Sequence, residues 1–338
     1  MKVEKIPIDW HPDLPIFAKE SFLKAVSDDY GWLGGFDEAG RLLCFLPYTI
    51  VRKAIFRMVR FRVETVPAAA DFGPSEERTF LNEAIGFFRA LGTDMIIPAT
   101  TNTIFRTYPD GADAAPYGSY VIDLSQPEEA LWKNLSAKNR QNINSARHGG
   151  VVVRSGEGSL EACHALIADT FKRSRLPFMN WKSFERYVRG LGDYARIMVA
   201  DRGGEIQSAS IYAFSDYAAY AVYGGNRPEI PQGAMKLVQW EAICAFKRLG
   251  VKRFDLVGTR IDPAKGSKQE ALSAFKKRFG AALRRGYIWK YPLHPVKYRL
   301  YGLAARLRSG GDIVDAERSK MKGYDPSEGE ADGRPDTD

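Results

Sequence analysis

The sequence has no run of the ~18 to 20 uncharged apolar residues that a membrane-spanning helix requires. Its start, Met1 to Trp10, also lacks the basic and apolar regions of a signal peptide. These two absences predict a cytosolic protein. At 338 residues, with 45% hydrophobic and 27% charged side chains, the chain has a globular composition and is long enough for two domains of ordinary size.

Cysteine and histidine are scarce, and neither occurs in a metal-binding pattern. The three cysteines, Cys44, Cys163 and Cys244, lie in apolar stretches without a Cys-x-x-Cys spacing. We predict that they are buried small hydrophobic residues rather than disulfide partners or metal ligands. The four histidines also lack a paired spacing, so we predict no metal site.

Acidic residues are missing from residues 271–311, which contain ten Lys or Arg interleaved with aromatic residues. Any one of these basic residues is explained by a solvated surface. The whole block favours an anionic partner, namely nucleic acid, a pyrophosphate or an anionic membrane surface. Residues 322–338 have the opposite charge, with six acidic and two basic residues and a net charge of −4. We therefore expect residues 312–338 to form an acidic, disordered tail.

The second half of the chain shows an ordered alternation of strands and helices. Apolar residues recur there at the helical period of 3.6 or at the strand period of 2, and Gly-containing turns separate the segments. The predicted order is strand 151–153, helices 159–171 and 180–191, strands 195–200, 205–214 and 217–223, helix 233–249, strand 253–257, a helix around Lys276 and strand 283–291. This is the element order of the GNAT acyltransferase fold.

The first half repeats this order in a degraded form. Its predicted strands are 2–8, 31–36, 42–50, 56–66, 94–98 and 120–124, and its helices are 16–26 and 76–91. We therefore predict an α/β protein with a mixed sheet and two tandem GNAT-like acyltransferase domains. The predicted parts are a first domain at 1–124, a helical connector at 125–150, a second domain at 151–311 and the tail.

Several short motifs occur one after another in a specific order. They are Asp71-Phe72-Gly73-Pro74, Trp132-x-x-Leu135-x-x-Lys138-x-Arg140, Tyr223-Gly224-Gly225, Phe254-Asp255-Leu256-Val257-Gly258 and Phe275-Lys276-x-x-Phe279-Gly280. In this order the chain resembles the Fem-type peptidoglycan bridge aminoacyltransferases, a GNAT-like family, over residues 10–291. The resemblance implies two GNAT-like domains and transfer of an amino acid from aminoacyl-tRNA to a peptide amine on a cell-wall precursor. The long coiled-coil arm of some members is missing.

Acyl transfer to an amine requires an activated acyl donor, a neutral amine and stabilisation of a tetrahedral oxyanion, but no covalent enzyme nucleophile. The sequence has no Gly-x-Ser-x-Gly elbow and no convincing Cys and His pair, and we predict no cofactor besides the acyl donor as co-substrate. We assign catalysis to Lys276, as a cation near the donor's phosphate or the developing charge, and to Asp255, which orients the amine or accepts its proton. The alternatives are a surface lysine and an aspartate that bonds the neighbouring backbone.

Donor binding is assigned to residues beside Lys276 and to the glycine-rich end of the strand before the long helix: Phe275, Lys277, Gly224, Gly225, Arg227 and Gly233. Glycine allows close backbone approach, and a helix that starts near Gly233 offers free amides to an anion, although a plain turn explains the Gly224-Gly225 pair equally well. Residues 227–234 do not fit the GNAT pyrophosphate loop, which weakens the case for coenzyme A.

Acceptor binding is assigned, through the resemblance, to Trp32, Asp71, Arg173, Arg175 and Tyr223. Arg60 and Arg62 lie in the same part of the first domain. The alternative for Trp32 is a core aromatic residue. The alternative for Asp71 and the two arginines is exposed strand charges.

Three functions remain open. The first is a Fem-like aminoacyltransferase that uses aminoacyl-tRNA and a phosphate-bearing cell-envelope precursor, in the cytoplasm or peripherally at the inner membrane face. The second is an acyl-CoA-dependent N-acyltransferase of envelope polysaccharide synthesis, and the third is an inactive RNA-binding or scaffold protein. Composition indicates no oligomeric state.

Overall fold

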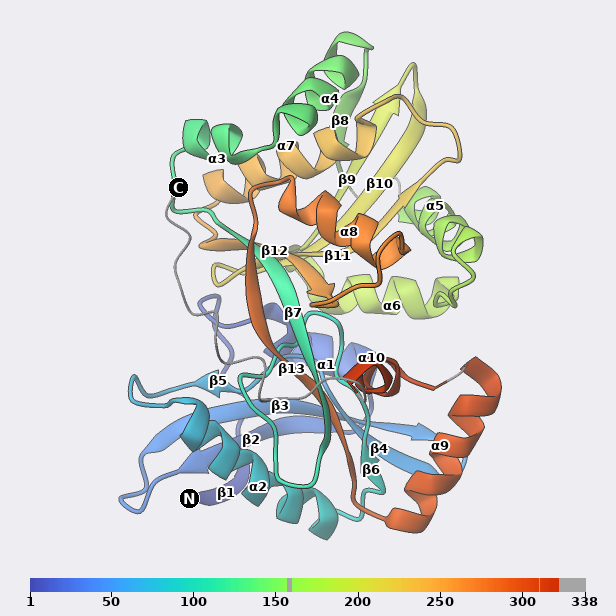
Figure 1. Ribbon diagram of the computed structural model, residues 1–338. Coiled ribbons are helices and arrows are strands. Elements are labelled where there is room, and N and C mark those ends of the chain that lie inside the picture. The colour runs from blue at the N-terminus through green and yellow to red at the C-terminus, as the bar shows by residue number, and fades with distance from the viewer. Residues whose placement is uncertain (157–159, 310, 322–338) are drawn as a thin grey trace.

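A single mixed β-sheet runs through the protein. The structure, a computed structural model, describes residues 1–156, 160–309 and 311–321 (Figure 1). Within these residues thirteen strands share one sheet in the order β1-β2-β3-β4-β6-β13-β7-β12-β11-β10-β9-β8, and β5 pairs with β3. The sheet has parallel and antiparallel neighbours, as predicted.

The first half forms the lower part of the molecule in Figure 1. Its strands are β1 (Lys2–Ile6), β2 (Tyr30–Phe36), β3 (Leu42–Lys53), β4 (Phe56–Phe61), β5 (Val66–Pro67), β6 (Met95–Ile96) and β7 (Asp113–Asp123). Its helices are the 3₁₀ turn η1 (Ile16–Ala18), α1 (Glu20–Val26) and α2 (Pro74–Ala90). Helix α2 covers one face of this part of the sheet with its apolar stripe of Phe80, Leu81, Ala84, Ile85 and Phe88.

The second half forms the upper part, after a connector of two helices, α3 (Glu128–Asn134) and α4 (Ala137–His148). Its strands are β8 (Val152–Ser155), β9 (Ala195–Arg202), β10 (Glu205–Phe214), β11 (Ala219–Asn226), β12 (Arg253–Thr259) and β13 (Ala282–Pro292). Its helices are α5 (Leu160–Arg173), α6 (Trp181–Leu191), the 3₁₀ turn η3 (Gly192–Tyr194), α7 (Ala234–Arg248) and α8 (Lys268–Lys277). The predicted order of elements is observed, and the described segment 174–180 joins α5 to α6 without a coiled-coil arm.

Helices cover both faces of the second half. Helices α4 and α7 pack on one face around Leu237, Trp240 and Ile243, and α5 and α6 pack on the other around Cys163 and Phe184. All three cysteines are buried, as predicted. Asn180 and Ser267 cap α6 and α8 by accepting hydrogen bonds from the backbone three residues on, which fixes where these helices begin.

The two halves exchange strands at the centre of the sheet. Strand β7 comes from the first half, yet it pairs with β12 in the register Asp255 with Val121. Strand β13 comes from the second half and pairs with β6 in the register Tyr291 with Ile96, while β7 and β13 pair with each other over nine residue pairs. Figure 1 shows both strands running from the upper part into the lower. The exchange ties the two halves into one body.

The chain returns to the first half after β13. Helix α9 (Pro295–Ser309) and helix α10 (Ile313–Met321) come next, so residues 313–321 of the expected disordered tail are helical, and the remainder, 322–338, lies outside the described residues. Val314 of α10 is fully buried, and Lys290 of β13 binds both Asp312 and Asp315. The first two acids of the expected tail are ion-pair partners of one basic strand residue, Lys290, which a local charge count does not reveal.

No helix among the described residues is long and apolar enough to span a membrane.

Candidate active site

Strands β11 and β12 diverge at the centre of the molecule. They are paired in parallel at only two positions, Ala219 with Phe254 and Tyr220 with Asp255. Beyond these pairs β11 has a bulge at Val222, and β12 has an irregular step between Asp255 and Gly258. Bulges next to a strand end re-aim side chains and release backbone groups from the ladder. The divergence opens the sheet toward the first half.

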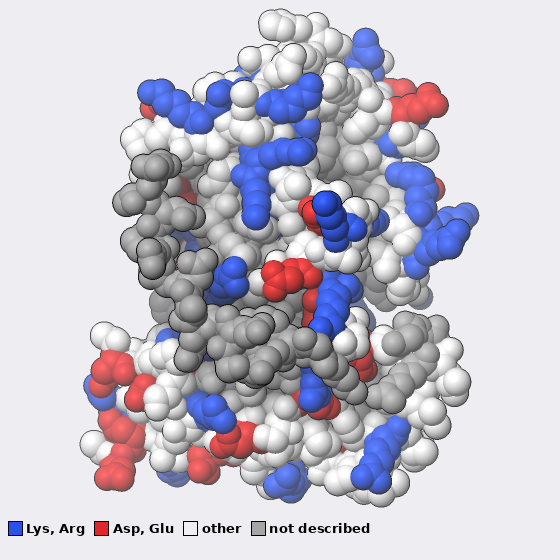
Figure 2. Space-filling view, in the orientation of Figure 1, with Lys and Arg blue, Asp and Glu red and all other residues white. Residues whose placement is uncertain are grey.

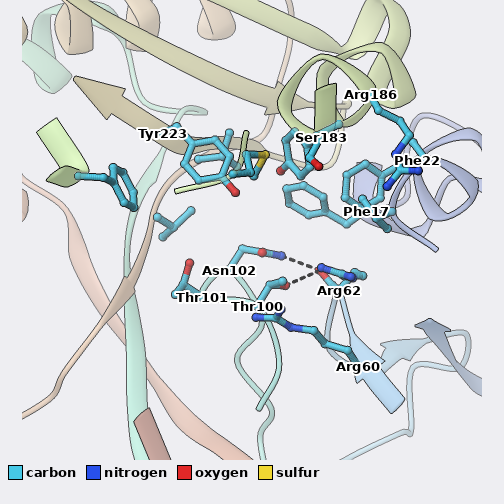
Figure 3. Close-up of a pocket in the computed structure, with 17 residues that line it drawn as sticks. Phe17, Phe22, Arg60, Arg62, Thr100, Thr101, Asn102, Ser183, Arg186 and Tyr223 are labelled. Atoms are coloured by element: carbon cyan, nitrogen blue, oxygen red, sulfur yellow. Dashed lines mark hydrogen bonds between the residues drawn. The ribbon is translucent and has the colours of Figure 1, made fainter. Parts of the chain in front are cut away.

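A cavity of about 450 Å³ lies at this opening, between the two halves. Figure 3 shows its two sides, with Arg60, Arg62 and Asn102 of the first half facing Ser183 and Tyr223 of the second. A volume of this size accommodates a small-molecule ligand or one end of a larger one. Concave sites between domains and beside diverging strands are the usual places for ligands in α/β proteins.

Arg60 and Arg62 are the charged centre of the cavity. Burial lowers the pKa of both guanidinium groups, and for Arg62 burial and then the charge of Arg60 lower it to about 9. Arg62 donates to the hydroxyl of Thr49 at 3.2 Å, and no carboxylate of the described residues forms an ion pair with either arginine. Two desolvated cations without a counter-ion form a binding site for an anion.

The backbone beneath this pair is held in place by the loop after β6. Asn102 donates its side-chain amide to the carbonyl of Arg62 at 2.7 Å, and the Thr100 hydroxyl donates to the same oxygen at 3.3 Å (Figure 3). This loop therefore fixes where Arg62 leaves the strand. The backbone at Arg62 is thereby pre-organised.

Aromatic residues form the opposite wall. The ring of Tyr223 lies 5.7 Å from that of Tyr187 and 6.4 Å from that of Phe171. Burial raises the pKa of both tyrosine hydroxyls, so they are neutral donors and acceptors at physiological pH. A substrate in the cavity meets the arginine pair on one side and aromatic rings on the other, where Arg186 of α6 is a further cation.

Behind the wall, Val257 adopts a left-handed backbone conformation with φ of +51°. For a β-branched residue this conformation costs about 1–3 kcal/mol, and it persists only where neighbours enforce it. The Val257 amide donates to Asp255 Oδ1, and Lys276 Nζ donates to the carbonyls of Val257 and Gly258, all at 2.7 Å. Asp255 and Lys276 together hold Val257 where it lines the cavity.

Asp255 and Lys276 are both desolvated. Asp255 is fully buried, accepts a hydrogen bond from Ser119 of β7, and has its pKa raised, chiefly by burial. Burial lowers the pKa of Lys276 to about 8. Neither side chain is among those that line the cavity. The alternative reading of Asp255, a hydrogen bond to neighbouring backbone, is what the structure contains.

The predicted donor-binding residues do not converge on the cavity. A Cβ on Gly225 would lie 2.6 Å from the Leu166 carbonyl of α5, so this glycine allows a helix to pack on the strand. Arg227 forms an ion pair with Glu205. Gly224 lies near Ser210 and Met235, and Gly233 packs on α4. Phe275 packs on Phe279, with ring centroids 5.1 Å apart, and Lys277 is exposed.

Among the predicted acceptor-binding residues, Tyr223 alone lines the cavity. Trp32 is buried and stacked on Phe45 at 4.3 Å, and exposed Asp71 pairs with Arg41. Arg173 binds Asp169 and the Asn226 carbonyl, and Arg175 is exposed.

The sequence placed Arg60 and Arg62 in the acceptor-binding part of the first domain, with exposed strand charges as the alternative. Arg60 lies in β4 and Arg62 lies directly after its end, and their spacing of two is a usable signal for a paired site. No spacing in the sequence marks the cavity residues of helix α6 and of the loop after β6, because they reach the cavity only through the packing of the two halves. They are Ser183, Arg186, Tyr187 and residues 100–102.

Comparisons with known proteins agree with this architecture. The family model described as "Acetyltransferase (GNAT) domain" matches residues 133–271. A crystal structure of FemX superposes with a TM-score of 0.68 at 12% identity and covers 89% of this chain and 99% of FemX. The C-terminal domain (DUF2156) of a putative lysylphosphatidylglycerol synthetase from Agrobacterium fabrum superposes with a TM-score of 0.53 at 13% identity, covering 88% and 94%.

A search of curated proteins finds no significant match. The solved structures share the fold with this chain at low identity, and the family model matches part of the chain, residues 133–271. The protein is an acyltransferase with a GNAT domain over those residues. Its whole chain has the Fem-type, GNAT-like fold that the sequence motifs predicted.

Proposed function

We propose that this acyltransferase moves an aminoacyl group from aminoacyl-tRNA to an amine of a phosphate-bearing cell-wall precursor, without a covalent enzyme intermediate. The observation that supports the proposal best is the pair Arg60 and Arg62, two half-buried cations without a carboxylate partner among the described residues, in the cavity between the halves. An anionic group of the acceptor fits between them, because guanidinium groups bind phosphate in a bidentate manner.

The same pair favours the reactive form of the nucleophile. An amine carried into the cavity is protonated in water, and nearby positive charge disfavours its ammonium form. Arg60 and Arg62 therefore lower the pKa of a bound amine while they hold the anionic part of the same molecule. Among the residues that line the cavity there is no cysteine or histidine, which supports direct attack of the amine on the donor's carbonyl.

The site for the carbonyl is proposed at the bulge of β11. Val222 is the extra residue there, and it lines the cavity beside Tyr223. A bulged residue leaves the ladder, so its backbone can donate to the oxyanion of the tetrahedral intermediate. The Tyr223 hydroxyl, kept neutral by burial, is a second donor at this end.

A basic surface on the second half supports a donor that bears many phosphates. It consists of Lys138 of α4, Lys236 of α7 and Lys277 and Arg278 at the end of α8. Burial and then the charges of Arg278 and Lys138 lower the pKa of Lys236, and none of the four forms an ion pair with a described residue. Figure 2 shows several blue groups on this front face, as expected for a surface that attracts an RNA backbone.

The start of α7 argues against coenzyme A in the usual GNAT position. A Cβ on Gly233 would lie 2.0 Å from the Asn142 carbonyl, and Gln232 donates to the Asn142 side chain at 3.0 Å. Helix α4 therefore covers the end of α7 that would present amides to a pyrophosphate. The acetyltransferase family match nevertheless favours acyl-CoA as the second candidate donor, with an amino sugar of envelope polysaccharide as its acceptor.

The decisive experiment compares the two donors with one acceptor mixture. The purified protein is incubated with envelope precursors and either charged tRNA or acetyl-CoA, and products are detected by mass. We expect an acylated amine with charged tRNA and none with acetyl-CoA. A product with acetyl-CoA alone establishes the second candidate, and salt-dependent RNA binding without any product contradicts both.

A further inference from the structure

Helix α9 presents an apolar stripe to solvent. Val296, Leu300, Leu303 and Leu307 are between 52% and 82% exposed. Their spacings of four, three and four residues place them within about 60° of the helix circumference. Isolated exposed apolar residues need no explanation, but a continuous stripe marks an interaction surface.

The opposite side of α9 is anchored to the first half. Lys297 binds Asp94 at 2.8 Å, the Tyr298 hydroxyl donates to Asp113 at 2.6 Å, and the Tyr301 ring lies 5.5 Å from Phe56. These contacts fix the orientation of the helix. The apolar stripe faces solvent because the opposite, polar and aromatic side of α9 contacts the first half.

The turn between β3 and β4 extends this surface. Ile55 is 66% exposed and directly precedes Phe56, the residue that contacts Tyr301 of α9. Figure 1 shows the end of this strand pair beside α9. We name the five residues Ile55, Val296, Leu300, Leu303 and Leu307 the α9 surface. They are five of the nine large apolar side chains exposed in the described part of the chain.

The charge around the α9 surface is positive. Lys53 and Arg299 are exposed beside it, and neither forms an ion pair with a described residue. Residues 295–309 contain four basic residues and no acidic one. Around α9 the described surface in Figure 2 is mostly white, with a blue group at its lower end. A helix with an apolar face flanked by Lys and Arg is typical of proteins that lie on anionic lipid.

We propose that the α9 surface docks this enzyme on an anionic membrane, with Leu303 and Leu307 entering the lipid interface and Lys53 and Arg299 contacting the headgroups. The chain thereby binds a membrane peripherally, through residues that lie outside the cavity of the proposed active site. This docking is independent of which acyl donor the cavity uses.

Two other occupants fit the same surface less well. A second copy of the chain would bring two positively charged surfaces together, each with Lys53 and Arg299, which like-charge repulsion disfavours. The acidic residues 322–338 contain no Leu, Ile, Val, Phe, Met or Trp, so that segment has no side chains to cover the leucines.

Vesicle co-sedimentation of the full chain tests the proposal. We expect binding to phosphatidylcholine vesicles with about 30% phosphatidylglycerol to be at least tenfold tighter than to pure phosphatidylcholine, since each basic residue near the surface adds severalfold. Lys53→Gln with Arg299→Gln should remove about tenfold of this preference. Leu303→Glu with Leu307→Glu should reduce binding to the anionic vesicles at least tenfold.

The matched control is Leu249→Glu, which changes a similarly exposed leucine at the end of α7 and should bind as the parent chain does. Equal binding to both vesicle types, no binding at all, or full binding by the Leu303 and Leu307 double variant overturns the proposal. A double variant that instead changes a dimer into a monomer in ultracentrifugation assigns the surface to a second copy. Because no acyl transfer is measured, these outcomes are separate from those that test the proposed function.

Discussion

In the first half the parallel pair β4 and β6 ends at Val59 and Ile96, and in the second half the pair β11 and β12 ends at Tyr220 and Asp255. Both ends open into the same cavity. Beyond its pair the first half contributes Arg60 and Arg62, whereas the second half contributes a bulge, aromatic rings and the strained Val257. The proposed site takes its arginine pair from one half and its bulged strand from the other, while Phe17 and Phe22 of the first half and Arg186 of the second also line the cavity.

The two halves also differ in the segment that comes after each strand pair. After β12 comes helix α8, whose Lys276 reaches back to the carbonyls of Val257 and Gly258. After β6 there is a loop, whose Thr100 and Asn102 bind the Arg62 carbonyl. Each half therefore uses its next segment to hold the residues that face the cavity. The two halves share a fold and differ in which side chains are held.

The largest expected effect is from removing the charge of the first half. Arg60→Ala combined with Arg62→Ala should lower kcat/KM by about a hundredfold or more, because the anionic group of the acceptor loses both partners. The melting temperature should stay the same or rise, since two desolvated cations without counter-ions are removed. Arg202→Ala, an exposed arginine of β9, is the control for charge alone. Unchanged turnover in the double variant would place the acceptor elsewhere.

The wall of the second half is tested by a change and its rescue. Lys276→Met should lower turnover by about tenfold or more, because Val257 is released from its left-handed conformation. Adding Val257→Gly should restore part of the activity, since glycine adopts positive φ without a clamp. If the double variant is as slow as Lys276→Met, the lysine instead contacts the donor, as its sequence motif predicted. Thermal unfolding of each variant confirms that the fold is retained.

The same lysine gives a pH test. Burial lowers its pKa to about 8, against an ordinary value of 10.5. Between these values the unfolded chain still binds the proton that the folded protein has released, so the contribution of Lys276 to the free energy of unfolding rises with pH. Denaturant titrations across this window should show a smaller rise in Lys276→Met than in the parent chain. Parallel curves would show that Lys276 is solvated.

The smallest effect is expected far from both pairs. Asp71→Ala should leave both turnover and the free energy of unfolding nearly unchanged, because its ion pair with Arg41 is exposed. A steady-state assay and a denaturant titration measure both quantities. A loss of turnover would show that Asp71 contributes to acceptor binding, as the sequence predicted.

Much of the fold was predictable because its signals are local. The apolar periods of α7 and β12 and the caps of α6 and α8 depend on neighbouring residues, and the structure has these elements near the predicted positions. Helix α10 was missed because its signal is not local: the acids at its start are neutralised by Lys290, a residue distant in sequence. A local charge count does not contain that partner.

By itself the sequence determined the order of strands and helices as far as β13, the buried cysteines and the Fem-type resemblance, because each depends on short spacings along the chain. Only the tertiary structure decided which residues make the site. Arg60 and Tyr223 come from different halves, and their approach depends on the exchange of β7 and β13. The contacts of Lys276 also depend on tertiary structure. The packing of α8 against β12 decides whether this lysine faces water or two backbone carbonyls.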